Sequence, residues 1–433
     1  MITILIFIFL ILFILLGLPI AVSMGLTAVL TFIFLGEGSI LTTLPQRMFY
    51  STSSFTLLAI PFFILAGNLM NTGGITRRIF RFAKALVGYI PGGLGHVNVV
   101  GNMIFSGMSG SAIADAVGLG QIQMKAMIDN GYDKNFSAAI TASASTIGPV
   151  IPPSIPFVVY GALTEVSVSK LFLAGFIPGL LMGLALMIAV FIISLIRKYP
   201  KERLESIKIY FKELFLSFID ALLPLLTPVI IIGGILSGQF TPTEASVIAT
   251  IYALILGLGY KEISLKDLPR IFWETINHTV RLMFIIAVAG FFSYILIHQK
   301  IPDHLIVTLT TMSANKYMVL AMVIFIILVL GFFIEGNAIF LITIPIFMPI
   351  VYQYNIDPVQ FGVLMTLGIM VGNITPPVGM CLFAVSSISK VPVMDIVKEI
   401  WPYLLGIFIV LLIVAYIPEV STIIPKLLLP NGG

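Results

Sequence analysis

The sequence predicts an all-α protein that crosses a membrane many times and is built from two related halves. Three observations support this fold class: an apolar composition, a series of apolar segments, and a proline motif that occurs twice. Of the 433 residues, 59% are hydrophobic and 10% are charged, and the mean hydropathy is +1.12. Soluble domains carry roughly 25% charged residues, so a membrane protein is predicted. The apolar segments lie at 1–36, 55–70, 93–118, 136–163, 171–196, 216–236, 243–259, 279–297, 305–350, 359–389 and 401–428.

The first apolar segment is predicted to be retained membrane helix. Residues 1–36 contain no charged side chain, and they lack the basic region and cleavage site of a secretory signal. The segment exceeds the ~20 residues that one span needs. The "GLP" sequence from Gly17 to Pro19 therefore predicts a break between two closely linked helices. Further along, "TPTE" at 241–244 predicts a capping box that starts another helix.

Charge and cysteine content narrow the function. The net charge of +4 comes from basic patches between apolar spans, at 77–84, 197–212 and 261–270. Such patches are typical of cytoplasmic loops and argue against nucleic-acid binding. The amphipathic stretch 77–90 predicts an arm helix that lies in the membrane interface. The single cysteine, Cys381, excludes an intramolecular disulfide and a cysteine-cluster metal site.

The proline motif marks an internal repeat. "GPVIPPS" begins at Gly148, and "GNITPPV" begins 224 residues later at Gly372. Both have glycine first and Pro-Pro at the fifth and sixth places, and each follows a predicted helix, at 136–147 and 361–371. Because proline has no amide hydrogen and clashes with the preceding turn, each pair predicts an interrupted helix.

A second shared feature lies upstream of each motif. The stretches "FSGMSGSAIADA" (105–116) and "GFFIEGNAIFLITIPIFMP" (331–349) are apolar but have a polar or glycine-rich centre. They are too polar at the middle for a simple crossing, so each predicts a re-entrant helical hairpin. Two halves, each with a hairpin followed by an interrupted helix, are the layout of an inverted-repeat secondary transporter.

Interrupted helices suit ion binding. Where a helix breaks, free backbone carbonyls can supply the oxygen ligands that a hard cation such as sodium requires. The predicted hairpin tips add oxygens from Ser106, Ser109 and Ser111 in the first half, and from Gly336 and Asn337 in the second. The start of each following half-helix favours an anionic group. One Pro-Pro kink alone favours a role in helix packing, but two matched copies reverse that preference and favour a coupled site for a cation and an acidic solute.

Other polar residues stand out within the apolar segments. An acidic side chain in a membrane is a functional candidate by default, and Glu335 lies at the predicted second hairpin tip. Asp115 either braces the first hairpin or takes part in function. Asn68 and Asn102 are predicted to form hydrogen bonds between helices.

Three other classes of protein fit the sequence less well. An enzyme would need a catalytic set, and the chain has no "HExxH" motif, serine–histidine arrangement or phosphate-binding loop. A channel would need a continuous polar lining, whereas the polar residues cluster at two hairpins. An ATP-driven pump would need a Walker loop, which is missing. A carrier driven by an ion gradient remains.

The chain also resembles a known family over nearly its whole length. The segments that carry the resemblance follow the family's order: "IPFFILAGNLM" (60–70), "SGMSGSAIADAVGLG" (106–120), "GY" (131–132), "GPVIPPSIPFVVYG" (148–161), "LFLAGFIPG" (171–179), "GGILSGQFTPTEAS" (233–246) and "TPPVG" (375–379). Together they resemble the large membrane subunit of tripartite ATP-independent periplasmic (TRAP) transporters. The resemblance implies a multi-pass protein of the bacterial inner membrane that takes up small organic acids with sodium. It also implies two partners, a small four-helix membrane subunit and a periplasmic substrate-binding protein.

By position, the resemblance implies two sodium sites and a substrate site, holding two or more ions in all. The first sodium site would use Ser106, Ser109, Gly148, Ile151 and Pro153. The second would use Gly336, Asn337, Gly372, Thr375 and Val378. Substrate contacts would come from Ser109, Ser154 and Glu335, where many relatives carry aspartate in place of the glutamate.

The resemblance further implies a stationary scaffold and a transport unit that moves like an elevator. The scaffold would comprise 1–90 with the arm helix, 166–300 with the polar loop 197–215, and 391–433. The transport unit would comprise 91–165 and 301–390. The substrate would be a sialic acid or a C4-dicarboxylate. The alternative is a sodium- or proton-coupled carboxylate carrier that works without a binding protein.

Overall fold

The computed structural model is helical throughout the residues that it describes, which are 2–200, 206–312, 315–332, 334 and 336–429. The all-α fold predicted from the sequence is confirmed. Two short 3₁₀ turns, η1 (Gly38–Thr43) and η2 (Phe55–Leu58), lie near the N-terminus. The helices of the first half are α1 (Ile2–Leu15), α2 (Ile20–Phe34), α3 (Leu44–Thr52), α4 (Ala59–Thr72), α5 (Ile75–Val87), α6 (Gly93–Ser109), α7 (Ala112–Asp129), α8 (Lys134–Ser145), α9 (Ile155–Thr164) and α10 (Val168–Arg197).

The second half follows the same order of elements. Its helices are α11 (Ile207–Leu236), α12 (Pro242–Gly259), α13 (Leu268–His298), α14 (Ile301–Met312), α15 (Lys316–Gly331), α16 (Gly336–Gln353), α17 (Pro358–Asn373), α18 (Met380–Ser389), α19 (Val393–Tyr416) and α20 (Glu419–Leu428). α7 and α16 begin 224 residues apart, at 112 and 336, and so do α8 and α17, at 134 and 358.

The helix starts explain why the two halves fold alike. α8 and α17 are capped by Asp133 and Asp357, and each carboxylate accepts hydrogen bonds from two backbone N–H groups of the first turn. These N–H groups have no partner within a helix, so an aspartate cap stabilises each start by about 1 kcal/mol. The predicted capping box of Thr241 and Glu244 is also present at the start of α12. An aspartate cap therefore fixes the start of the corresponding helix, α8 or α17, in each half.

Both predicted interruptions are present. α8 ends at Ser145 and α9 begins at Ile155, whereas α17 ends at Asn373 and α18 begins at Met380. The Pro-Pro pairs lie inside these two gaps, and both Pro–Pro bonds are cis. The predicted break near Gly17 is present as well, between α1 and α2. Proline thus ends these helices as the sequence predicts.

Each interrupted helix is preceded by a pair of helices joined by a short link. α6 and α7 pack against each other and are joined through Gly110 and Ser111, and α15 and α16 are joined through 332–335. We call these pairs hairpin 1 and hairpin 2. Their re-entry into a membrane stays a prediction. In the described part of the chain, seven segments are long and apolar enough to cross a membrane: 55–72 and the helices α10, α11, α12, α13, α16 and α19.

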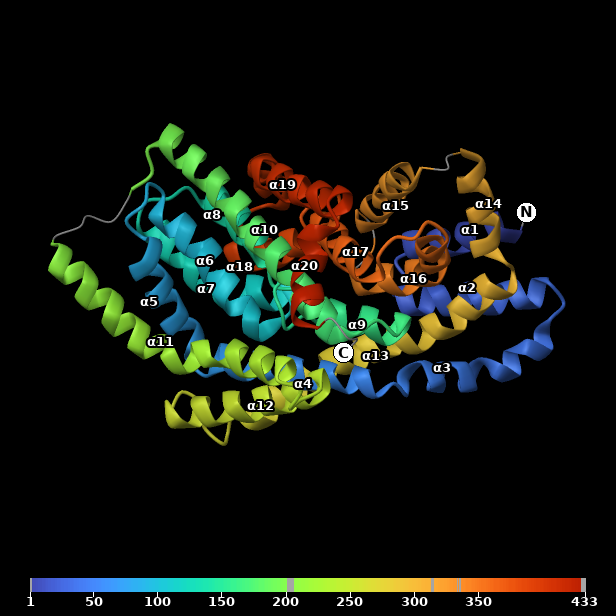
Figure 1. Ribbon diagram of the computed structural model, residues 1–433, viewed down its shortest axis with the longest axis horizontal. Helices are drawn as coiled ribbons and strands as arrows, with labels where there is room; N and C mark the ends of the chain where they lie inside the picture. The colour runs from blue at the N-terminus through green and yellow to red at the C-terminus, as the bar shows by residue number, and fades with distance from the viewer. Residues whose placement is uncertain (1, 201–205, 313–314, 333, 335, 430–433) are drawn as a thin grey trace.

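The helices pack in two groups. α4 packs against α12, and α13 packs against α2 and α3, so these helices run along one side of the molecule (Figure 1). The hairpins and interrupted helices lie beside them, and α10 and α19 pack onto this second group, against α8 and α17. The predicted division placed α10 and α19 in the scaffold. Their contacts bring them to the hairpins instead, and the division stays a prediction.

The predicted arm helix forms as α5, but its apolar face is not left for lipid. Ile75, Ile79 and Ala83 are fully buried, because α6 and α11 pack over them. On the other face, the Arg81 guanidinium lies 2.9 Å from the Glu213 carboxylate of α11 and 3.5 Å from that of Asp220. The amphipathic pattern therefore serves packing against α6 and α11.

Candidate functional site

The first interruption exposes backbone oxygens to the interior. After α8, the chain turns tightly, with Val150 and Ile151 both donating their N–H groups to the Ile147 carbonyl. Within the described residues, no N–H or hydroxyl donates to the carbonyls of Gly148, Ile151 or Pro153. These three carbonyls are the ones predicted for the first sodium site. The turn therefore leaves three buried acceptors that need a partner.

The tip of hairpin 1 lies directly against this turn. Gly110 has φ +63°, and a Cβ atom there would lie 2.7 Å from the Pro153 carbonyl oxygen. A side chain would therefore be both strained and too close. Ser111 caps α7 by accepting from the Ala114 N–H. The tip and the turn approach each other with only backbone between them.

Asp115 completes the arrangement. Its side chain is fully buried, and its Oδ1 accepts a hydrogen bond from the Ser109 hydroxyl. Its Oδ2 has no hydrogen-bond partner in the described part of the chain, and this oxygen covers the space where a Gly148 Cβ would lie. The carboxylate thus links Ser109 at the hairpin tip with Gly148 at the start of the turn. An anionic oxygen beside carbonyl oxygens is a ligand set suited to a hard cation.

The other predicted hydroxyls of this half are bonded locally. The Ser154 hydroxyl donates to the Pro149 carbonyl and accepts from the Phe157 N–H, so it caps α9. The Ser106 hydroxyl donates to the Met103 carbonyl of its own helix at 2.8 Å. Ser154 is therefore bonded within the interruption, whereas Ser109 is connected to it only through Asp115, whose other oxygen lies against Gly148. Among the described residues, the Ser106 hydroxyl makes no hydrogen bond to the interruption.

The second interruption is arranged in a similar way. Gly331, at the end of α15, lies against Gly372, where a Cβ atom would come within 2.7 Å of the Gly331 Cα. The Val378 N–H donates to the Phe332 carbonyl at 3.3 Å, so the turn is bonded to the hairpin link. The Thr375 N–H donates to the Gly372 carbonyl at 3.1 Å.

The remaining predicted residues of this half lie at the start of α16. Gly336 is its first residue and lies close to Ile369 of α17, and Asn337 follows it. Glu335 lies outside the described residues. The position that corresponds to Asp115, 224 residues later, is Ile339, which is fully buried. A buried acid is therefore present in hairpin 1 and replaced by an aliphatic side chain in hairpin 2.

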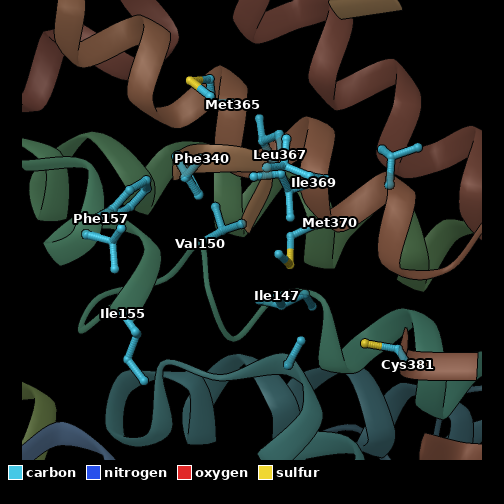
Figure 2. Packing of buried hydrophobic residues seen from close by; sticks show 14 of the residues in the cluster. Ile147, Val150, Ile155, Phe157, Phe340, Met365, Leu367, Ile369, Met370 and Cys381 are labelled. Atoms are coloured by element: carbon cyan, nitrogen blue, oxygen red, sulfur yellow. The ribbon is translucent and has the colours of Figure 1, made fainter. Parts of the chain in front are cut away.

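Apolar packing surrounds the interruptions. Figure 2 shows Ile147 and Val150 of the first turn together with Met370 of α17. Cys381 of α18 lies beside Ser145, at the end of α8. All of these side chains except that of Ser145 belong to one buried hydrophobic cluster. The polar atoms of the first interruption therefore lie in a water-poor surrounding, where oxygen ligands bind a cation strongly, whereas Pro377 of the second interruption is exposed.

Sequence reasoning left the role of Asp115 open because its side chain could brace the hairpin or serve function. The structure shows the bracing, because one oxygen accepts a hydrogen bond from Ser109. The other oxygen lies against Gly148, and a part of Asp115 in function stays a prediction. The available signal was an acid within an apolar segment, six residues after a tip serine.

Comparison with known proteins establishes the family. The family model described as "Tripartite ATP-independent periplasmic transporter, DctM component" matches residues 7–420. The chain belongs to this DctM family. The sialic acid TRAP transporter large permease protein SiaM of Vibrio cholerae is 42% identical over 417 residues, which is 96% of each chain. The C4-dicarboxylate TRAP transporter large permease protein DctM of Pseudomonas aeruginosa is 41% identical and covers 93% of this chain and 94% of its own.

A solved structure supports the fold independently. The YdaH transporter of Alcanivorax borkumensis superposes with a TM-score of 0.55 at 14% identity, covering 88% of both chains. As a DctM protein, the chain is the large permease of a tripartite TRAP system and an integral protein of the inner membrane. The resemblance noted in the sequence is confirmed.

Proposed function

We propose that this DctM protein carries out sodium-coupled uptake of a small organic acid that a periplasmic binding protein delivers. The observation that carries the proposal is the turn after α8: three of its carbonyls have no donor in the described chain, and Asp115, which is bonded to Ser109, lies against Gly148 of the same turn. The three carbonyls, the Ser109 hydroxyl and the Asp115 Oδ2 provide up to five oxygens. Hard cations of similar size take six to eight oxygen ligands, and water would supply the rest. We assign them to one sodium ion, and we assign a second ion to the corresponding turn after α17.

The net charge of the site favours a cation over a proton alone. The Asp115 carboxylate supplies one negative charge, and a sodium ion would neutralise it without leaving the carbonyls unpaired. A proton on Asp115 would satisfy the carboxylate but would leave the carbonyls of Gly148, Ile151 and Pro153 without donors. Proton coupling is the second candidate, since a buried acid with one unpaired oxygen could also bind a proton.

The acidic substrate is proposed to bind between the two interruptions. The starts of α9 and α18 carry the positive end of the helix dipole and follow the two turns directly. Ser109, Ser154 and Glu335 are the proposed contacts. The named relatives transport sialic acid and C4-dicarboxylates, and their similar identities of 42% and 41% favour neither substrate.

We further propose that hairpins, interrupted helices and the helices that pack on them move as one unit. The contacts of α10 and α19 with α8 and α17 support including these two helices in that unit. α2, α3, α4, α12 and α13 would form the stationary scaffold. This unit would carry the site past the scaffold, as in other transporters built from repeats.

The test is uptake into vesicles that contain the chain with its small membrane partner and its binding protein. Uptake of the binding protein's ligand should stop when external sodium is replaced by potassium at equal ionic strength. Vesicles without the chain control for leakage. Uptake that continues unchanged in potassium and responds only to a pH gradient would favour proton coupling and reject sodium.

A further inference from the structure

A cluster of four polar side chains lies deep inside the first half, away from the proposed ion ligands. Asn98 and Asn102 belong to α6, Gln123 to α7 and Thr141 to α8, and all four are fully buried. The Asn98 Nδ2 donates to the Thr141 hydroxyl at 2.7 Å, and the Asn102 Nδ2 donates to the Gln123 Oε1 at 3.1 Å. We call these four side chains the amide cluster. It joins both limbs of hairpin 1 to the helix that precedes the first interruption.

The backbone also takes part in the cluster. The Gln123 Nε2 donates to the Asn98 carbonyl at 3.2 Å and to the Val97 carbonyl at 3.5 Å, so it reaches across α6. Gly101 makes this possible, because a Cβ atom there would lie 2.6 Å from the Gln123 Nε2. Gly120 likewise leaves room for the Thr141 methyl group. The absence of side chains at two glycines lets the three helices approach closely enough to bond.

The second half has no such cluster at the corresponding places. α7 and α8 correspond to α16 and α17 at a spacing of 224, which aligns Gln123 with Phe347 and Thr141 with Met365. The link of hairpin 2 is two residues longer, so α6 and α15 correspond near the tips at 222. The asparagines Asn98 and Asn102 then align with Leu320 and Ile324. All four replacements are buried and apolar.

The two hairpins are therefore held by different forces. In hairpin 2, apolar side chains pack together, and they can slide or separate into lipid or other apolar surface with little change in free energy. In hairpin 1, separating the limbs from α8 would leave buried amide and hydroxyl groups without partners. These hydrogen bonds also fix how α6, α7 and α8 are aligned along their axes. Apolar packing fixes such an alignment less strictly.

Three side chains of the amide cluster lie at similar distances along their helices from the residues of the proposed cation site. Asn102 precedes Ser109 by seven residues, Gln123 follows Asp115 by eight, and Thr141 precedes Gly148 by seven. At 1.5 Å per residue, each separation is about two helical turns, or roughly 11 Å. The three elements that supply ligands are thus bonded together two turns away from those ligands.

We propose that the amide cluster positions the ligands of the first cation site by locking hairpin 1 to α8. The inference rests on the proposed function, because it assigns the site a supporting structure. Without the lock, the tip carrying Ser109 and Asp115 would move relative to the Gly148 carbonyl, and the site would bind sodium more weakly. Groups that hold metal ligands in place commonly change metal affinity by about 10-fold or more when removed.

The test uses Thr141→Val, which keeps the shape of the side chain and removes the acceptor for Asn98. Gln123→Met removes the second connection. Each variant should raise the sodium concentration for half-maximal uptake about 10-fold, with a smaller effect on the maximal rate at saturating sodium. Thr141→Ser, which retains the hydroxyl, should restore the wild-type value.

Thr366→Val is the matched control. Thr366 is a fully buried threonine on α17. Its hydroxyl donates to the Gly362 carbonyl of its own helix at 2.9 Å and to no other group among the residues that the structure describes. The Thr366→Val variant should leave the sodium concentration for half-maximal uptake unchanged.

Amide hydrogen exchange provides a readout that does not depend on transport. In Thr141→Val and Gln123→Met, exchange should accelerate in residues 105–116 and stay unchanged in 336–347. Folded variants with wild-type sodium dependence and wild-type exchange at 105–116 would overturn the lock. If wild-type uptake proves independent of sodium, the proposed function fails, and the exchange result still decides whether the cluster holds the hairpin.

Discussion

At the scale of single residues, Asp115 is the side chain on which the proposed chemistry depends most. It is fully buried, it is bonded to Ser109, and one of its oxygens is directed at Gly148 without a partner in the described chain. A buried charge that lacks a partner is costly, and a bound cation removes that cost. The internal repeat replaces it with Ile339, so the residue belongs to one site only.

Replacing Asp115 distinguishes its contribution to sodium binding from its contribution to the stability of the fold. Asp115→Asn keeps an oxygen for the Ser109 hydroxyl and removes the buried charge, so stability without sodium should be equal or higher. Wild-type protein should gain about 2.7 kcal/mol when sodium reaches 100 times its dissociation constant, and the variant should lose most of this gain. Thermal unfolding in potassium chloride measures the stability without sodium, and the increase in sodium chloride measures the gain from binding. A variant that keeps the full sodium-dependent stabilisation would contradict the assignment of Asp115 as a ligand.

At the scale of elements, the tip of hairpin 1 is defined by its contact with the broken helix. The link between α6 and α7 has only two residues, and Gly110 lies against the Pro153 carbonyl. The link has a left-handed glycine because the chain must reverse within a very small space. A similar contact joins Gly331 with Gly372 in the second half. Glycines thus allow backbone to meet backbone at both interruptions.

A pair of glycine variants tests this contact. Gly110→Ala should destabilise the protein by the ~1–2 kcal/mol cost of the left-handed backbone and by the clash with the Pro153 oxygen in addition. Gly238→Ala has a similar backbone, with φ +69°, and no atom within 4 Å of its Cβ, so it carries the backbone cost alone. The difference between the unfolding free energies of the two variants measures the cost of the clash at the hairpin tip. Equal losses would show that the tip does not press on the turn.

At the scale of the whole molecule, the packing divides the helices differently from the order of the chain. α10 and α19 lie near the ends of two different halves of the chain, yet they pack against each other and against α8. The guanidinium of Arg197 at the end of α10 lies 2.7 Å from the Glu399 carboxylate of α19. Shared contacts of this kind are expected within a unit that moves as one body.

A disulfide between α10 and α19 tests that unit. A Cβ atom on Gly406 would lie 3.3 Å from the Ala185 Cβ, close to the ~3.8 Å of a disulfide. In a Cys381→Ala background, Ala185→Cys with Gly406→Cys should form a disulfide on oxidation and leave uptake unchanged, because both helices move together. Uptake lost on oxidation and restored by reduction would place α10 and α19 in different bodies.

Much of the fold and part of the site could be predicted from local patterns. The Pro-Pro pairs, the caps at Asp133 and Asp357, and the glycine-rich tip of hairpin 1 act within a few residues, so their positions in the sequence predict where helices start and stop. The same patterns predicted free carbonyls in the turn after a broken helix, and the family resemblance implied that those of Gly148, Ile151 and Pro153 are the relevant ones. Asn68 and Asn102 were rightly predicted to bond between helices, to Thr275 and Gln123 respectively.

The sequence by itself determined that the chain is a two-fold repeat of helices with matched interruptions, because composition, periodicity and proline act locally. Only the tertiary structure decided which groups face one another: the second oxygen of Asp115 at Gly148, the amide cluster across three helices, and the packing of α5, α10 and α19. These relations join residues far apart in the chain, and their free energy comes from burial and pairing. No local pattern encodes them.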